Sequence, residues 1–126
     1  MDILENLKYT AEHEWIKIED NIATVGITDF AQGELGDIVY IEIDTLGNEL
    51  KANDVFGTVE AVKTVSDLFM PIDGKVIELN SKLDNNPELV NNDPYGEGWI
   101  IKIEISNNYN NSSLLSAEEY RNLTQG

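Results

Sequence analysis

The sequence predicts a mainly β protein built of two small antiparallel sheets that face each other with pseudo-twofold symmetry. Most of the chain alternates between apolar and polar residues, which is typical of half-buried strands. The apolar runs are short, and Gly, Asn or Asp separates them. Two pairs of runs also resemble each other at a spacing of about 34 to 38 residues, which indicates an internal repeat.

The strand pattern occurs in several runs along the chain. They are residues 15–19, 23–27, 39–43, 55–62, 65–70, 75–79 and 99–105. Strict alternation places every second residue of a run on the same face of its sheet. The apolar sets expected to share a face are Ile16 with Ile18, then Ala23 with Val25 and Ile27, then Val39 with Ile41 and Ile43, and finally Trp99 with Ile101, Ile103 and Ile105.

Two helices interrupt the strand pattern. The first is a short helix over residues 28–35, with Thr28 as its N-cap. The second begins after Ser116, where Ser116 and Glu119 have the spacing of a capping box, and it contains Tyr120 and Leu123. Residues 106–113 are rich in Asn and Ser and predict an exposed loop before this second helix.

The length of 126 residues predicts a single domain with one compact core. We divide it into an N-terminal extension over about residues 1–20, a core over about 21–105, and a C-terminal loop and helix over about 106–126. Lys and Arg total 8 against 24 Asp and Glu, a formal net charge of -16. Nucleic acid and membrane surfaces are therefore poor partners, because binding to them needs clustered cations. We expect a monomer.

The chain contains no cysteine and one histidine, His13. Disulfides, thiolate nucleophiles and cysteine metal sites are therefore excluded, and classical hydrolase triads have no support. One histidine with carboxylates remains formally open as a metal site, but we predict none. The oxygen-rich stretch from 84 to 93 lacks the ligand spacing of a calcium loop because Pro87 and two apolar residues interrupt it. The N-terminus has neither a basic start nor an apolar segment, so we expect a cytoplasmic protein.

The internal repeat draws attention to one lysine. Residues 23–27 resemble 57–61, and residues 36–41 resemble 74–79. The two β-prone runs around Lys63 predict a hairpin with this lysine at its turn, clear of the core. The first half has Asp29 at the corresponding position, so only one of the two turns can be acylated. From composition alone, a plain solvated lysine remains the alternative.

Several stretches of the chain resemble one known family in the family's own order. They are residues 13–15, 26–29, 36–39, 60–67, 71–80 and 86–99. They are similar to the glycine cleavage system H protein family, and the resemblance extends from about residue 7 to residue 123. It implies a lipoyl-domain-like barrel or sandwich hybrid in which Lys63 bears lipoic acid in amide linkage. A lipoyl dithiolane would supply the two sulfurs that the sequence lacks.

The resemblance also implies a function and partners. The chain would be a non-catalytic carrier that takes an aminomethyl group from glycine decarboxylase to a tetrahydrofolate-dependent aminomethyltransferase. Dihydrolipoamide dehydrogenase would then reoxidise the dithiol, and a lipoyl-attaching enzyme would modify the lysine. Glu60, three residues before Lys63, is a candidate for recognition by the attaching enzyme. Glu14 is a candidate for sheltering the loaded arm, with a plain surface carboxylate beside a packed Trp15 as the alternative, and we expect His13 to be structural.

Related carrier families differ from this sequence around the lysine. Biotin carriers have a lysine between two methionines, whereas Val62 and Thr64 flank Lys63. Lipoyl domains of 2-oxo acid dehydrogenases usually have an Asp before the lysine and belong to longer chains. A lipoyl relay that donates lipoyl groups to 2-oxo acid dehydrogenases remains open, as does an unmodified protein-binding β domain.

Overall fold

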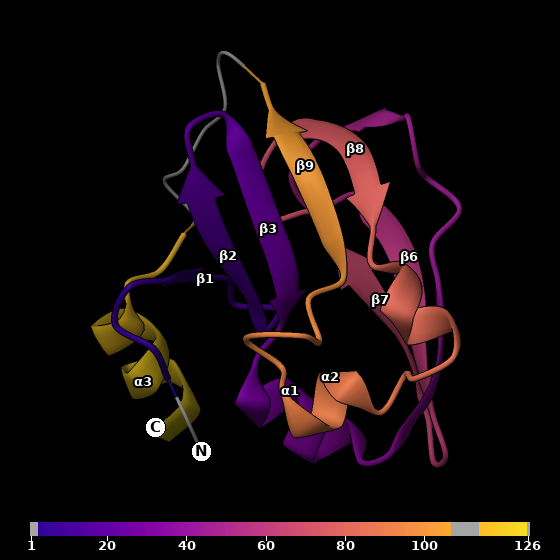
Figure 1. The fold of residues 1–126 in the computed structure, drawn as a ribbon. Helices are drawn as coiled ribbons and strands as arrows, with labels where there is room; N and C mark the ends of the chain where they lie inside the picture. The colour runs from indigo at the N-terminus through magenta and orange to yellow at the C-terminus, as the bar shows by residue number, and fades with distance from the viewer. Residues whose placement is uncertain (1–2, 107–113, 126) are drawn as a thin grey trace.

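The computed structural model describes residues 3–106 and 114–125. Within these residues, two antiparallel sheets face each other, which confirms the mainly β fold (Figure 1). In spatial order, the six-stranded sheet contains β1 (Lys8–Tyr9), β2 (Glu14–Glu19), β3 (Ile22–Ile27), β9 (Ile101–Ile105), β8 (Gly74–Leu79) and β5 (Glu49–Leu50). The three-stranded sheet contains β4 (Ile38–Glu42), β6 (Val55–Ala61) and β7 (Val65–Phe69).

The internal repeat is visible in the topology. The matched segments 23–27 and 57–61 fall in β3 and β6, which belong to opposite sheets. The other matched pair, in β4 and β8, also lies in opposite sheets, with the order exchanged. This exchange is what a pseudo-twofold relation requires. The halves differ between their matched strands, because Asp29 begins a helix where the second half has a hairpin.

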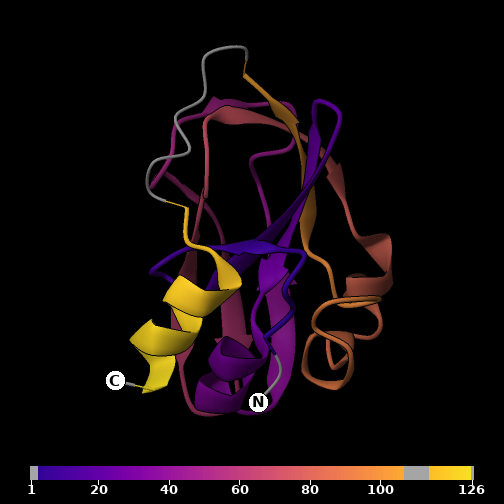
Figure 2. The same cartoon turned by 90° about the vertical axis from the view of Figure 1, so that its left-hand side faces the viewer.

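Both predicted helices are present. Helix α1 (Asp29–Leu35) begins after Thr28, whose Oγ1 accepts a hydrogen bond from the Ala31 amide over 3.1 Å. Helix α3 (Ala117–Gln125) begins with the capping box, since the Ser116 amide donates to Glu119 Oε1 and the Glu119 amide donates to Ser116 Oγ. Figures 1 and 2 place α1 at one end of the sandwich and α3 outside it, beside β1.

Two short helical segments were not predicted. A 3₁₀ turn, η1 (Ser81–Asp84), follows β8, and α2 (Leu89–Asn92) lies within the oxygen-rich stretch from 84 to 93. Among the described residues, no group of three or more His, Cys, Asp or Glu side chains is arranged to hold a metal ion. The same part of the chain contains no helix both long enough and apolar enough to cross a membrane.

The apolar side chains form two clusters. The larger fills the space between the sheets. The smaller lies where α3 meets β1, and its buried members are Leu7, Tyr9, Trp15, Ala117 and Tyr120. The rings of Tyr9 and Tyr120 stack there with centroids 4.6 Å apart. Because this cluster covers the second face of β2, Trp15 is buried although it alternates with the core residue Ile16.

Strict alternation was wrong at three places. Val39 is 48% exposed while Ile38 is buried, because β4 is bulged between Ile38 and Tyr40 and the bulge changes the phase of the pattern. Ile18 lies in the exposed half of β2. Trp99 precedes β9 and packs on the smaller cluster, so it does not share the face of Ile101. Of the expected loop over 106–113, residues 107–113 lie outside the described residues.

Candidate functional site

Lys63 lies in the turn of the β6–β7 hairpin, where the sequence predicts it. The hairpin pairs Glu60 with Val65, and the Ala61 amide donates to the Thr64 carbonyl over 2.8 Å. Val62 and Lys63 are both exposed, and Val62 is exposed to 76%. The hairpin forms here because β-branched residues on both sides favour extended backbone. Figure 1 shows the hairpin projecting at the end of the molecule where α1 and α2 lie.

The segment from 36 to 38, between α1 and β4, contacts this turn. The Asp37 carbonyl accepts a hydrogen bond from the Val62 amide over 3.1 Å. The neighbouring Gly36 ends α1 with φ of 79°, a backbone conformation that favours glycine. A Cβ atom at Gly36 would lie 3.6 Å from Lys63 Cε, so the aliphatic part of the lysine passes directly over this bend. The bend from 36 to 38 therefore contacts both the backbone and the side chain of the turn.

Glu60 lies on the outer face of the three-stranded sheet. It is directly opposite Tyr40 on β4 and Val65 on β7, so the three side chains form one row across the sheet. All three are exposed. The row lies next to the Lys63 turn and offers an approaching protein one carboxylate between two apolar groups.

Glu14 is buried, so the alternative that it is a surface carboxylate is wrong. Its residue is 2% exposed, and it shares the core-facing side of β2 with Ile16. Thr10 Oγ1 donates to one carboxyl oxygen over 3.1 Å, and the Phe69 amide donates to the other over 2.9 Å. Burial raises the pKa of Glu14 to about 8, against the smaller opposing effect of these two hydrogen bonds.

A small cavity opens beside Glu14. Its volume is about 90 Å³, and its lining residues are Thr10, Ala11, Glu12, Glu14, Asn53, Met70 and Pro71. Two of these residues are glutamates, one buried and one exposed, and none is a lysine or an arginine. The cavity therefore suits a small cationic group better than an anion.

His13 has a structural position, as expected. It adopts φ of 70° in the turn between β1 and β2, and its ring lies against Phe30 with centroids 4.7 Å apart. Its Nδ1 is 2.9 Å from the hydroxyl of Tyr120, which is also 2.7 Å from Thr28 Oγ1. Burial lowers the pKa of His13, which favours the neutral ring, and the tautomer of that ring sets which partner donates in the contact with this hydroxyl.

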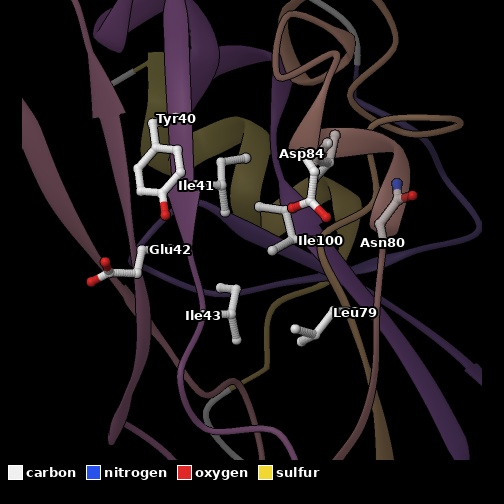
Figure 3. Close-up of a pocket in the computed structure, with 9 residues that line it drawn as sticks. Tyr40, Ile41, Glu42, Ile43, Leu79, Asn80, Asp84 and Ile100 are labelled. Carbon is white, nitrogen blue, oxygen red and sulfur yellow. The ribbon is translucent and has the colours of Figure 1, made fainter.

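Another cavity, of about 150 Å³, lies between β4 and the segment from β8 to η1. In Figure 3, Ile41 and Ile43 face Leu79 and Ile100 across it, while Glu42 points away. Lys63, Glu60 and Glu14 are not among its lining residues. Its aliphatic walls continue the core at an edge of the sandwich, and it is separate from the lysine turn.

Comparison with known protein families shows the family of this chain. Residues 7–126 match the family model described as glycine cleavage H-protein. The chain belongs to the glycine cleavage H-protein family. This confirms the family resemblance seen in the sequence.

Individual members of the H-protein family are similar to this chain over nearly its whole length. A glycine cleavage system H protein of Bacteroides fragilis is 56% identical over 121 residues, which cover 96% of each chain. That of Symbiobacterium thermophilum is 57% identical over 120 residues, covering 95% of this chain and 94% of the relative. The crystal structure of a glycine cleavage system H protein from Mycobacterium marinum superposes with a TM-score of 0.90 at 35% identity, covering 98% and 100% of the two chains.

The sequence pattern does not reveal one residue that contacts the bend between α1 and β4, next to the lysine turn. Asn91 of α2 hydrogen-bonds to both sides of the bend beneath Lys63. It lies in a polar stretch with three other asparagines nearby, at 85, 86 and 92, and nothing in the pattern distinguishes it. Its partners are more than 50 residues away in sequence, so only the fold brings them together.

Proposed function

We propose that this chain is the lipoyl-lysine carrier of a glycine cleavage system and that Lys63 bears the lipoyl group. The observation that carries the proposal is the position of Lys63 in an exposed turn supported by a second segment. Its amine makes none of the ion pairs found within residues 3–106 and 114–125, so it is open to acylation. Full-length similarity to proteins named for glycine cleavage supports the system.

Lipoic acid fits the chemistry of this chain. The sequence has no cysteine, so the redox-active sulfurs of a carrier have to come from an attached group. When bound, a lipoyl group supplies a dithiolane on an arm of roughly ten single bonds that reaches well over 10 Å. The chain itself would hold and present that arm and catalyse no reaction.

The partners in this proposal are glycine decarboxylase, the aminomethyltransferase, dihydrolipoamide dehydrogenase and the lipoyl-attaching enzyme. A net charge of -16 supports partners with basic docking surfaces, because long-range attraction speeds their encounter with the carrier. A cytoplasmic, monomeric carrier is part of the same proposal.

In this proposal, Glu60 helps the lipoyl-attaching enzyme to recognise the lysine turn. Its carboxylate is exposed at the hairpin, in one row with Tyr40 and Val65. An attaching enzyme could pair a cation with Glu60 while it covers the two apolar side chains. The charge would set orientation and rate of encounter more than affinity.

In this proposal, Glu14 holds the aminomethyl group when the lipoyl arm is loaded. The aminomethyl cargo ends in an amine that is protonated near neutral pH, and the cavity of about 90 Å³ beside Glu14 suits a small cation. Phe69, whose amide holds Glu14, lies about 13 Å along β7 from Val65, which is comparable with the reach of the arm. A cation in the cavity would favour the ionised form of Glu14 and gain a charge-assisted contact.

The proposal is tested by acylation and mapping. The purified chain is incubated with a lipoyl-attaching enzyme, lipoate and ATP, and the modified peptide is identified by mass spectrometry. We expect modification at Lys63 alone among the seven lysines. Lys63→Arg should abolish it while circular dichroism stays unchanged. Modification of the Lys63→Arg variant at a comparable rate elsewhere would refute the assignment, and no modification of the parent chain would favour an unmodified protein-binding domain.

A second assay separates the carrier from a relay. The lipoylated chain is added to glycine decarboxylase with glycine and labelled bicarbonate. A carrier supports exchange of the label into glycine, which requires that the decarboxylase accept the arm of this chain. A relay that only donates lipoyl groups to other proteins would not support it.

A further inference from the structure

Asn91 joins α2 to the bend between α1 and β4. Its Oδ1 accepts a hydrogen bond from the Ile38 amide over 2.9 Å, and its Nδ2 donates to the Gly36 carbonyl over 2.8 Å. Nδ2 also donates to Gln32 Oε1 over 3.0 Å, which ties Asn91 to α1. One amide side chain therefore holds the backbone on both sides of Asp37.

Asp37 is the residue whose carbonyl supports the Lys63 turn. It accepts the Val62 amide over 3.1 Å, and Gly36 beside it lies beneath Lys63 Cε. The regular ladder between β4 and β6 is weakened here, because a bulge follows Ile38. Strand pairing alone therefore does not fix the backbone conformation at this end of β4. The hydrogen bonds of Asn91 to Gly36 and Ile38 fix it instead.

We propose that Asn91 is a positioning residue that holds the bend at Asp37, and through it the Lys63 turn, in the orientation that the lysine-acylating enzyme requires. The inference rests on the proposed acylation of Lys63. It concerns a residue that touches neither the lysine nor its turn and acts through the backbone of 36–38.

The amide group of Asn91 is specifically suited to this position. Ile38 needs an acceptor for its amide and Gly36 needs a donor for its carbonyl, and only an amide offers both at this length. Aspartate would keep the acceptor but place a carboxylate against the Gly36 carbonyl. Alanine would remove both bonds and leave the amide of the buried Ile38 without this partner.

Loosening the bend should lower the fraction of molecules with a productive turn. An enzyme that binds only the productive conformation then shows an apparent affinity reduced by that fraction. Once bound, the turn is held by the enzyme, so turnover changes little. We therefore expect Asn91→Asp and Asn91→Ala to raise the KM for the carrier by about fivefold or more, with kcat within about twofold of the parent.

The experiment measures initial rates of Lys63 lipoylation by mass spectrometry over a range of carrier concentrations. Amide hydrogen exchange of residues 61–64 is measured on the same unmodified proteins, and it should be faster in both Asn91 variants. Should Asn91→Ala not fold, Asn91→Asp carries the test, since it retains the acceptor for Ile38. A parent chain that is not lipoylated at all refutes the proposed function, whereas the exchange measurement still reports on the bend.

Two controls separate positioning from other effects. Asn92→Asp introduces the same charge at the exposed neighbouring residue and should leave KM and exchange at 61–64 unchanged. Val76→Ala removes methyl groups from the buried side of β8 and should lower the melting temperature without raising KM. A parent-like KM and parent-like exchange in Asn91→Asp would overturn the inference, as would an equal rise of KM in Val76→Ala.

Discussion

The carboxyl group of Glu14 accepts a hydrogen bond from the Phe69 amide over 2.9 Å and so connects β2 of one sheet to the end of β7 in the other. This contact uses one carboxyl oxygen, and Thr10 Oγ1 donates to the second. The group is buried, and its pKa is raised to about 8 by that burial. At neutral pH it is therefore mostly protonated, which makes it a neutral structural link with a titration close to physiological pH.

Glu14→Gln should make the stability of the protein less dependent on pH. Between the ordinary value of 4.5 and about 8, the native protein retains the Glu14 proton while the unfolded chain loses it. The native state binds more protons in this window, so the contribution of Glu14 to the free energy of unfolding falls as pH rises. Glutamine imitates the protonated form, and its advantage over Glu14 should reach the order of a few kcal/mol by pH 9.

Urea unfolding at pH 5, 7 and 9 measures this difference. Parent and Glu14→Gln should be similar at pH 5 and separate progressively above it. Glu12→Gln, at an exposed neighbouring carboxylate, is the matched control and should follow the parent. Parallel pH profiles for parent and Glu14→Gln would show that Glu14 has an ordinary pKa.

Tyr120→Phe should destabilise the protein by about 1 to 3 kcal/mol. The hydroxyl lies 2.7 Å from Thr28 Oγ1 and 2.9 Å from His13 Nδ1, so its removal deprives two polar groups of a partner. Thr28 is fully buried and cannot turn to water instead. Because Thr28 also caps α1, amide exchange at the start of α1 should become faster.

Tyr40→Phe is the control for this substitution. Tyr40 is 50% exposed on the outer face of the three-stranded sheet, and loss of its hydroxyl should change the free energy of unfolding by less than about 0.5 kcal/mol. Chemical denaturation of the three proteins gives the comparison. Equal stabilities of Tyr120→Phe and the parent would mean that the His13, Tyr120 and Thr28 contacts contribute nothing net.

The alternation of apolar and polar residues predicted most of the strands because it is typical of strands with one face buried and the other exposed to solvent. It also contained the signal for the burial of Glu14, which has the same parity as the core residue Ile16, although a surface carboxylate stayed open as the alternative for this residue. Alternation failed for Trp99 because this residue packs on the smaller cluster, which helix α3 and the N-terminal segment form outside the sandwich. That cluster depends on contacts between the two ends of the chain, which no local pattern contains.

The lysine turn was predictable and its support was not. Two β-prone runs around one lysine define a hairpin locally. The support from Asp37 and Asn91 joins segments about 25 and 50 residues apart, and it depends on a bulge whose position the β4 sequence does not reveal. Hydrogen bonds of this kind, from a side chain to the backbone of a distant loop, form only in the folded structure. They produce no periodic pattern in the sequence.

Exchanging Val62 and Lys63 should preserve the fold and reduce lipoylation on the order of tenfold or more, because a displaced nucleophile loses its productive geometry. Both side chains are exposed, so the exchange costs no packing. Residue 62 donates its amide to Asp37, and residue 63 passes over Gly36, so the two positions differ in direction. Initial rates of acylation, with circular dichroism as the folding check, measure the effect.

Val62→Ala keeps the lysine in place and is the control for the exchange. It should be lipoylated at the rate of the parent, because the Val62 side chain is 76% exposed and its backbone bond to Asp37 remains. Equal rates for the exchanged protein and the parent would mean that the attaching enzyme does not distinguish the two positions of the turn.

Glu14→Gln should also hasten the non-enzymatic loss of the aminomethyl cargo from the loaded carrier. In the proposed loaded state, the cargo amine lies in the cavity beside Glu14 and is protonated, and the nearby cation favours the ionised carboxylate. Glutamine keeps the bond to Phe69 but offers no negative charge, so the cargo is held less firmly and meets water more often. Glutamine is the informative substitution, because alanine would also remove the acceptor of a backbone amide.

Ammonia release from purified loaded protein, with no aminomethyltransferase present, measures the loss. The difference between Glu14→Gln and the parent should be greatest at low ionic strength, where charge pairing is least screened. Acylation of Lys63 should be unchanged in the variant, since Glu14 lies at the far end of β7 from the turn. Glu12→Gln, at an exposed carboxylate lining the same cavity, should have a smaller effect because solvent weakens its attraction for the cargo. Identical release rates for Glu14→Gln and the parent at low salt would exclude Glu14 from sheltering the cargo and leave it a purely structural link between β2 and β7.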